Sequence, residues 1–253
     1  MQINNIYDCH VHSCFSADGI ATMREMCEEA IRKSLRGIAF TDHIDTEKRE
    51  HLNDLAIRKR YVEEIYALKR YYSPALDVIC SYELSSPHRE SLITERLYDE
   101  CFDYRMISVH HGAMEIPLKN KKEYIKSYLM EAESAVCSGE YHVLGHIDLL
   151  RRFYGNFFFE ESQLQALYVT MIEKNMALEI NSHSFKKKAS ISREDLAYVE
   201  EWKICGGKHI VLGSDAHSCE NVAIRFEEIL HYLPQGLEIG HFAKGSFVID
   251  KIS

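Results

Sequence analysis

Short apolar runs alternate with longer amphipathic stretches along the whole chain. The short runs are rich in β-branched and aromatic residues and have the length of buried strands. They predict strands over Asn5–His12, Gly37–His43, Leu76–Leu84, Tyr104–His110, His142–Leu149, Met176–Ser182, His209–Asp215 and Ser246–Asp250. The amphipathic stretches predict helices over Thr22–Leu35, Ile57–Tyr72, Lys121–Cys137, Glu160–Glu173, Ser192–Ile204 and Asn221–Tyr232. The first helix has a capping box, because Glu25 follows Thr22 at the required spacing.

This regular alternation of strand and helix predicts an α/β protein. Parallel neighbouring strands need a helical crossover, because a tight hairpin joins only antiparallel strands. No Ser/Gly-rich linker interrupts the series, and the chain has only four prolines. Residues 1–253 are therefore predicted to form a single domain.

Polar residues at the ends of the predicted strands distinguish two α/β architectures. An open doubly wound sheet has the same local pattern as a closed barrel, but it gathers its ligands at one switch point. In a barrel, the carboxyl ends of all strands meet at one mouth. Nearly every predicted strand ends in a polar cluster, which includes His10, His12, Asp42, His43, Glu83, His110, His146, Asp148, Asn181, Asp215 and His217. This distribution favours a TIM-like barrel.

Composition and charge limit the expected cellular location and partners of this domain. The chain has 253 residues, is 46% hydrophobic and carries a formal net charge of −9, so we expect one large core and no broad nucleic-acid surface. No apolar run approaches the roughly 18 residues that cross a bilayer, and no basic stretch precedes an apolar block at the N-terminus. We therefore expect a cytoplasmic protein without a membrane partner. The eight scattered cysteines indicate neither a zinc ribbon nor a disulfide framework.

Two short motifs place metal-binding side chains next to each other. Within residues 8–12, the alternation of strand side chains puts His10 and His12 on one face. Asp215 and His217 repeat the same spacing with a carboxylate and an imidazole. A single pair is equally compatible with core histidines bonded to the backbone. Two such pairs at strand ends favour metal coordination.

Further nitrogen and oxygen ligands follow other strands. Glu83 comes at the inner end of a buried strand, where a carboxylate is costly unless it is paired or coordinates a metal. A salt bridge with an arginine is the alternative. His43 ends another strand, His146 lies in the predicted strand His142–Leu149, and periodicity does not decide whether His110 or His111 faces inward. Imidazole and carboxylate ligands suit zinc, manganese or iron(II).

Taken in order, these motifs resemble those of the polymerase-and-histidinol-phosphatase (PHP) family. The resemblance is carried by residues 8–13, 18–19, 41–43, 83, 108–111, 145–148 and 214–217, and it spans residues 8 to 218. It implies a distorted (β/α)7 barrel with three divalent metal ions. The two arginines after the histidine in residues 145–153, and the chain length, are most similar to histidinol phosphatases. The resemblance therefore implies hydrolysis of L-histidinol phosphate.

Carried over residue by residue, the resemblance assigns the metal ligands and prefers His110 to His111. His10, His12, Glu83 and Asp215 belong to the first metal neighbourhood. Asp18, His43 and His217 belong to the second, and His110 and His146 belong to a third that shares Glu83. Some relatives have histidine where this chain has Asp18, and this harder ligand favours manganese or iron over zinc.

The reaction expected at such a site is attack of a metal-bridging hydroxide on the phosphorus of a small phosphate ester. Arg152 or Arg151 is expected to hold the phosphate oxygens, because a guanidinium matches their geometry. Asn181 and His183 are expected either to contact the imidazole or amine of the substrate or to bond with the backbone. The predicted catalytic residues are His43, His217 and Asp215, and the leaving alkoxide takes its proton from His43, His217 or water.

The segment after Asn181 departs from the family pattern. The phosphatases continue there with a small residue, then Gly-Leu-Arg and later Tyr-Pro-Ser, whereas this chain continues SHSFKKK over residues 182–188. The lysines are interpreted as a solvated loop. Alternative functions are a PHP phosphoesterase for nucleotides, short oligonucleotides or other small esters, an amidohydrolase, and a non-catalytic metal-binding module. The complete ligand set argues against the last.

Overall fold

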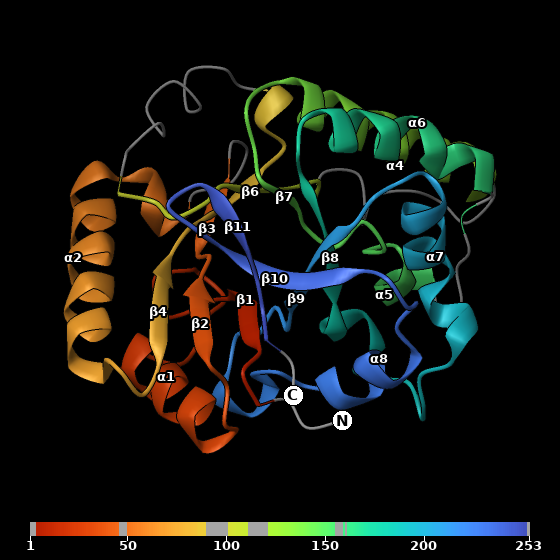
Figure 1. Cartoon of the computed structure of the whole chain (residues 1–253). Helices are drawn as coiled ribbons and strands as arrows, with labels where there is room; N and C mark the ends of the chain where they lie inside the picture. Colours follow the sequence, from red (N-terminus) through yellow and green to blue (C-terminus); the bar gives the residue numbers. More distant parts are fainter. Residues whose placement is uncertain are drawn as a thin grey trace.

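The strands form a closed ring with the helices outside it (Figure 1). The computed structural model describes residues 4–45, 50–89, 101–110, 121–154, 159 and 161–251. The strands are β1 (Tyr7–Val11), β2 (Gly37–Phe40), β3 (His43–Asp45), β4 (Asp77–Cys80), β5 (Glu83–Ser85), β6 (Met106–Ser108), β7 (Val143–Leu144), β8 (Ala177–Asn181), β9 (His209–Gly213), β10 (Glu238–Ala243) and β11 (Ser246–Ile249). The α-helices are α1 (Met23–Arg32), α2 (Leu55–Tyr72), α4 (Lys121–Cys137), α5 (Arg151–Tyr154), α6 (Glu161–Glu173), α7 (Ala197–Ile204) and α8 (Phe226–Tyr232).

Two of the predicted strands are each divided in two. The stretch 37–43 forms β2 and the start of β3, and the stretch 76–84 forms β4 and the start of β5. β2 pairs with β1 and β4, whereas β3 pairs with β5, which continues to β6. Each break therefore lets the chain leave one sheet and continue in the other. When β2 is counted with β3 and β4 with β5, the described strands of the ring occupy seven parallel positions: β1, β2/β3, β4/β5, β6, β7, β8 and β9. This confirms the expected distorted (β/α)7 barrel.

The ring closes where the first strand meets the end of β9. The Asp215 amide donates to the His10 carbonyl at 2.7 Å, and the His12 amide donates to the Ala216 carbonyl at 2.8 Å. Val11 and Ala216 form a parallel bridge between these bonds. Closure therefore brings the motifs of residues 8–12 and 215–217 next to each other.

A C-terminal hairpin of β10 and β11 packs beside β9 and against the N-terminal end of β1. β10 was not predicted, whereas β11 confirms the predicted strand Ser246–Asp250 to within one residue. β10 runs parallel to β9 and antiparallel to β11. The ring of His241 in β10 stacks on Tyr7 at 3.6 Å, and its Nδ1 lies 2.7 Å from Oδ1 of Asp250. These contacts fasten the hairpin to β1.

Local sequence explains most helix boundaries. The capping box of Thr22 and Glu25 is present at the start of α1. The predicted helix Ser192–Ile204 begins as a 3-10 turn and becomes α-helical only at α7, and the predicted helix Asn221–Tyr232 begins only at Phe226, because Arg225 has a left-handed φ of 61°. α5 was not predicted, and Glu160 lies outside the described residues. None of the described helices is long and apolar enough to cross a membrane.

Apolar side chains fill both sides of the barrel wall. The larger cluster packs the strands against the helices and includes Phe40, Tyr61 and Trp202. A smaller cluster includes Cys9, Met106, Val143, Ala177 and Val211. Because these smaller-cluster residues precede the polar strand ends, they form an apolar floor beneath the mouth.

Candidate metal centre

The carboxylate of Glu83 lies at the centre of a group of imidazoles. Glu83 begins β5 and is fully buried. Its Oε2 lies 3.0 Å from Nδ1 of His43, 3.2 Å from Nε2 of His10 and 3.4 Å from Nε2 of His12. The Nε2 atoms of His10 and His12 are 3.0 Å apart. The structure therefore brings together His10 of β1, His12 directly after it, and two ligands predicted on other strands.

The second oxygen of Glu83 faces two further imidazoles. Oε1 lies 2.7 Å from Nε2 of His146 and 3.3 Å from Nε2 of His110, and these two nitrogens are 3.2 Å apart. His146 has a positive φ of 25°, and such strain is found where a site over-determines the backbone. His110 is thus placed within the cluster, whereas His111 lies outside the described residues.

The cluster sets the protonation of its own members. Burial alone would raise the pKa of Glu83, but the charges of His10 and His110 outweigh it and hold the pKa well below its usual range. Burial lowers the pKa of His12 well below its usual range, and the charge of His43 adds to this effect. An ionised carboxylate and a neutral imidazole are the forms that bind metal ions.

Asp215 is the second buried carboxylate of the cluster. It follows β9 with a left-handed φ of 51°. Its Oδ1 lies 3.1 Å from Nε2 of His12 and 3.6 Å from Nε2 of His10, while its Oδ2 accepts from Nη2 of Arg152 at 2.7 Å. Burial would raise the pKa of Asp215, but Arg152 and His10 hold it well below its usual range.

His43, His217 and Asp18 form the outer part of the cluster. The side chains of His43 and His217 are 13% and 24% exposed, and that of Asp18 is 61% exposed. Asp18 reaches Nε2 of His217 at 3.3 Å and Nε2 of His43 at 3.8 Å. Partial burial would raise the pKa of Asp18, but the hydrogen bond with His217 and the charge of His43 lower it. This side of the cluster is open to solvent.

The side chains together fit divalent metal ions. Among the residues that the structure describes, four groups bring three ligand atoms within 4.8 Å of one another, namely His12–His43–His217, His10–His12–Glu83, His10–His146–Asp215 and His43–Glu83–His110. All donors are imidazole nitrogens or carboxylate oxygens, as zinc, manganese and iron(II) accept. Because His10, His12, His43 and Glu83 each belong to two groups, the groups form one continuous cluster. Asp18 is in none of these groups.

Glu179 is a buried acid that the motifs did not single out. Its Oε1 lies 2.6 Å from Nδ1 of His10, and its Oε2 accepts from the His146 amide at 2.5 Å. Asn181 donates to the same Oε1 at 3.1 Å. A carboxylate on the far nitrogen of a ligating histidine fixes the orientation of its ring. The available signal was the alternation within β8, which puts Glu179 on the same face as Asn181.

Asp42 holds the loop that follows β1. It accepts from the amide and hydroxyl of Ser13 at 2.7 and 2.9 Å and from the hydroxyl of Ser16 at 2.8 Å. The same Ser16 hydroxyl accepts from the His43 amide at 3.0 Å and lies 3.2 Å from Nδ1 of His12. Asp42 therefore positions two imidazoles of the cluster through Ser16.

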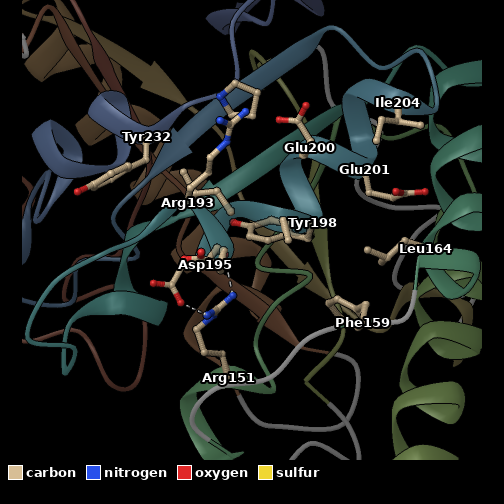
Figure 2. A pocket seen from close by; sticks show the side chains of 14 residues that line it. Arg151, Phe159, Leu164, Arg193, Asp195, Tyr198, Glu200, Glu201, Ile204 and Tyr232 are labelled. Carbon is tan, nitrogen blue, oxygen red and sulfur yellow. Dashed lines mark hydrogen bonds and ion pairs between the residues drawn. The ribbon is translucent and has the colours of Figure 1, made fainter.

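The two arginines predicted to hold phosphate point in different directions. Arg152 reaches Asp215, as described above. Arg151 is buried and donates from Nη1 and Nη2 to Oδ1 and the carbonyl of Asp195, both at 2.8 Å, and from Nε to Asp148 at 3.3 Å. Figure 2 shows Arg151 and Asp195 at the edge of a pocket between α6 and α7, outside the strand ring. The guanidinium of Arg151 is therefore occupied by protein groups.

Asn181 and His183 lie on the Arg152 side of the cluster. The side-chain oxygen of Asn181 accepts from Nη2 of Arg152 at 2.8 Å and from the His183 amide at 3.1 Å. Nδ1 of His183 lies 3.3 Å from the carbonyl oxygen of Asp215. Burial and the charge of Arg152 lower the pKa of His183 to about 4. Both side chains thus bond within the protein next to Asp215.

The fold and the cluster together are those of a TIM-like barrel built to bind metal ions. The PHP domain matches residues 8–183, and the chain belongs to the PHP family. It is a metal-dependent phosphoesterase of this family.

Comparisons with individual proteins agree with this family. The histidinol-phosphatase of Lactococcus lactis is 31% identical over 228 residues, which cover 83% of each chain. The probable histidinol-phosphatase of Thermotoga maritima is 24% identical and covers 89% of this chain and 90% of its own length. The crystal structure of the Lactococcus lactis histidinol phosphate phosphatase with zinc, L-histidinol and phosphate has a TM-score of 0.77 at 24% identity and covers 96% of this chain and 99% of its own.

Proposed function

We propose that residues 1–253 act as one phosphomonoesterase domain that hydrolyses L-histidinol phosphate to L-histidinol and phosphate. The observation that carries the proposal is the buried cluster around Glu83, with Arg152 beside it on Asp215. The substrate is supported by the similar Lactococcus lactis protein, whose structure contains L-histidinol, phosphate and zinc.

The cluster residues would hold three divalent ions, of zinc, manganese or iron. Such ions supply Lewis-acid activation of water and neutralise charge on the phosphoryl group. The metal ligands we propose are His10, His12, Asp18, His43, Glu83, His110, His146, Asp215 and His217. Glu83 presents both oxygens to opposite sides of the cluster, which suits a ligand shared between ions.

The remaining roles follow from exposure and position. His43 and His217 are partly exposed imidazoles beside Asp18, and we propose that one of them or a water molecule protonates the leaving alkoxide. Asp215 contacts both His12 and Arg152. For Arg152 we propose contact with the phosphate oxygens. Asn181 and His183 hold Arg152 and the adjoining loop in place.

A second candidate is hydrolysis of a different small phosphate ester, including nucleotides. It is favoured by the loop after Asn181, where this chain departs from the histidinol-phosphatase pattern and carries three consecutive lysines. L-Histidinol phosphate carries a positively charged amine, which a basic loop would repel.

Phosphate release tests both candidates. The metal-replete protein is assayed with L-histidinol phosphate, nucleotides and sugar phosphates, beside a chelator-treated sample and the variants His12→Ala and Asp215→Asn. We expect chelator-sensitive hydrolysis that both variants abolish together with bound metal, with L-histidinol phosphate giving the highest kcat/KM. Activity that persists in metal-free protein contradicts the proposal, and activity on other esters only moves the function to the second candidate.

A further inference from the structure

A basic pocket adjoins the cluster on the side of Asp215. Its volume is about 250 Å³, and it is lined by Arg151, Arg152, His183, Ser184 and residues 186–188, which we name the lysine loop. Nη2 of Arg152 lies 2.7 Å from Oδ2 of Asp215, and Nδ1 of His183 lies 3.3 Å from the Asp215 carbonyl oxygen. The pocket and the metal cluster therefore share a wall.

The lysine loop is held in place by hydrogen bonds and packing. The amide of Lys186 donates to the His183 carbonyl at 3.0 Å, and the amide of Lys188 donates to the Phe185 carbonyl at 3.0 Å. Nη1 of Arg225 donates to the carbonyl of Lys188 at 2.8 Å, and the Phe185 ring is fully buried. The backbone that carries the lysines is thus tied to the barrel, and their positions relative to Asp215 are defined.

The charges of this pocket are unequal. Lys188 forms an ion pair with Asp195 at 2.5 Å, and Asp195 also forms an ion pair with Arg151. Within the part of the chain that the structure describes, Lys186 and Lys187 have no ion-pair partner, and no residue that lines the pocket is acidic. The pocket therefore has a local excess of positive charge, although the net charge of the whole chain is −9. Lys186 and Lys187 are exposed at the rim of this pocket, and a cleft lined by one sign of charge raises the local concentration of ions of the opposite sign.

We propose that this pocket is a second anion subsite, and that the site also accepts phosphomonoesters with a further anionic group, a carboxylate or a second phosphate, in preference to uncharged esters of the same length. The ester phosphate would lie at the cluster while the second anion meets Lys186 and Lys187. The inference rests on the proposed phosphomonoesterase activity and develops its second candidate. An ammonium group in the same position would be repelled, so the amine of L-histidinol phosphate would have to lie away from Lys186 and Lys187.

A matched series of substrates tests the subsite. Short alkyl phosphates of equal length that end in a hydroxyl, a carboxylate, a phosphate or an ammonium group are compared by kcat/KM at low ionic strength. We expect the anionic endings to exceed the hydroxyl ending by about tenfold, as charge-assisted hydrogen bonds allow, and the ammonium ending to be poorest. The carboxylate and phosphate arms tell the two kinds of anion apart.

Two variants assign the preference to the loop. In Lys186→Gln/Lys187→Gln we expect the ratio of kcat/KM for the substrates with an anionic ending to kcat/KM for the substrate with a hydroxyl ending to fall towards one. The control Lys203→Gln/Lys208→Gln removes two exposed lysines at the end of α7 and the start of β9 and should keep the ratio. Equal kcat/KM for all endings in the unmodified protein overturns the subsite, as does a ratio that Lys186→Gln/Lys187→Gln leaves unchanged.

Binding separates the subsite from the proposed activity. Non-hydrolysable alkyl phosphonates with the same endings are titrated calorimetrically into the metal-replete protein. Tighter binding of anionic endings, lost in Lys186→Gln/Lys187→Gln, supports the subsite even if no ester is hydrolysed, and in that case the phosphatase proposal falls. Hydrolysis without any preference for anionic endings, in turnover or in binding, supports the phosphatase proposal and contradicts the subsite.

Discussion

Nη2 of Arg152 donates to Oδ2 of Asp215 at 2.7 Å and to the side-chain oxygen of Asn181 at 2.8 Å. This pairing fixes the rotation of the Asp215 carboxylate, so that its other oxygen faces His12 at 3.1 Å. Arg152 therefore orients a proposed metal ligand and also lines the basic pocket.

Removal of Arg152 is expected to weaken the metal cluster. In Arg152→Ala, Asp215 loses the partner that orients it, and we expect metal affinity and kcat/KM to fall by about 10- to 100-fold. Arg152→Lys should recover only part of this loss, because an ammonium lacks the guanidinium fork. Competition with a chromophoric chelator measures the affinity. Arg32→Ala, on the exposed side of α1, is the control, and an Arg152→Ala protein that binds metal equally well would refute the orienting role.

Glu179 is expected to act through His10 and His146. In Glu179→Gln the shape is kept but the charge beside Nδ1 of His10 is lost, so we expect about a 10- to 100-fold fall in metal affinity. The effect on kcat should follow metal occupancy and disappear at saturating metal. Glu200→Gln on α7 serves as a control. A variant with normal metal affinity but low kcat would show that Glu179 does not act by positioning the ligands.

Gly213 at the end of β9 leaves room for Glu179. A Cβ at this position would lie 1.9 Å from Oε1 of Glu179 and 2.6 Å from the Cβ of His10. Gly213→Ala should therefore lower the free energy of unfolding by about 1–3 kcal/mol and displace Glu179. At Gly145, a Cβ would meet nothing closer than 3.4 Å, so Gly145→Ala is the matched control. Urea denaturation compares the two, and equal midpoints would count against this steric account.

His142 is expected to make the fold sensitive to acid. Its Nδ1 accepts from the Arg105 amide at 3.0 Å, and burial together with the charge of Arg105 lowers its pKa to about 4. In the unfolded chain the pKa of histidine is about 6.5, so the unfolded state takes up the proton first and stability falls as pH drops from about 6.5 to 4. In His142→Asn this part of the fall should be missing. Melting temperatures across this range measure it, and parallel curves for the two proteins would argue against it.

The fold was predictable where local patterns coincide with the final pairing. The cap at Thr22 and the alternation of His10 and His12 depend on neighbouring residues only, and the structure contains both arrangements. The division of the stretch 37–43 into β2 and β3 depends on a change of partner strand, which no local pattern records. β10 was missed for a similar reason, since its place is set by β9 and by the stacking of His241 on Tyr7.

The site was predictable as a set of residues, but its internal contacts were not. Arg151 and Arg152 are adjacent in sequence, and α5 turns them about 100° apart, so that one meets Asp195 and the other Asp215. Those partners come from later in the chain, and their choice requires the closed ring. Glu179 had no motif of its own, although the alternation of β8 would have placed it beside Asn181.

The seam between β1 and β9 joins two segments that lie far apart along the chain. Ser214 donates its amide to Asp8 at 2.9 Å across a separation of 206 residues. Metal ions held between His10, His12 and Asp215 would staple this seam, in the way that a cross-link closes a very long loop. Closing so long a loop costs conformational entropy before the contact stabilises the fold, so such contacts form slowly. Metal uptake should therefore be among the last events of folding, and chelation should release the seam before the rest of the barrel.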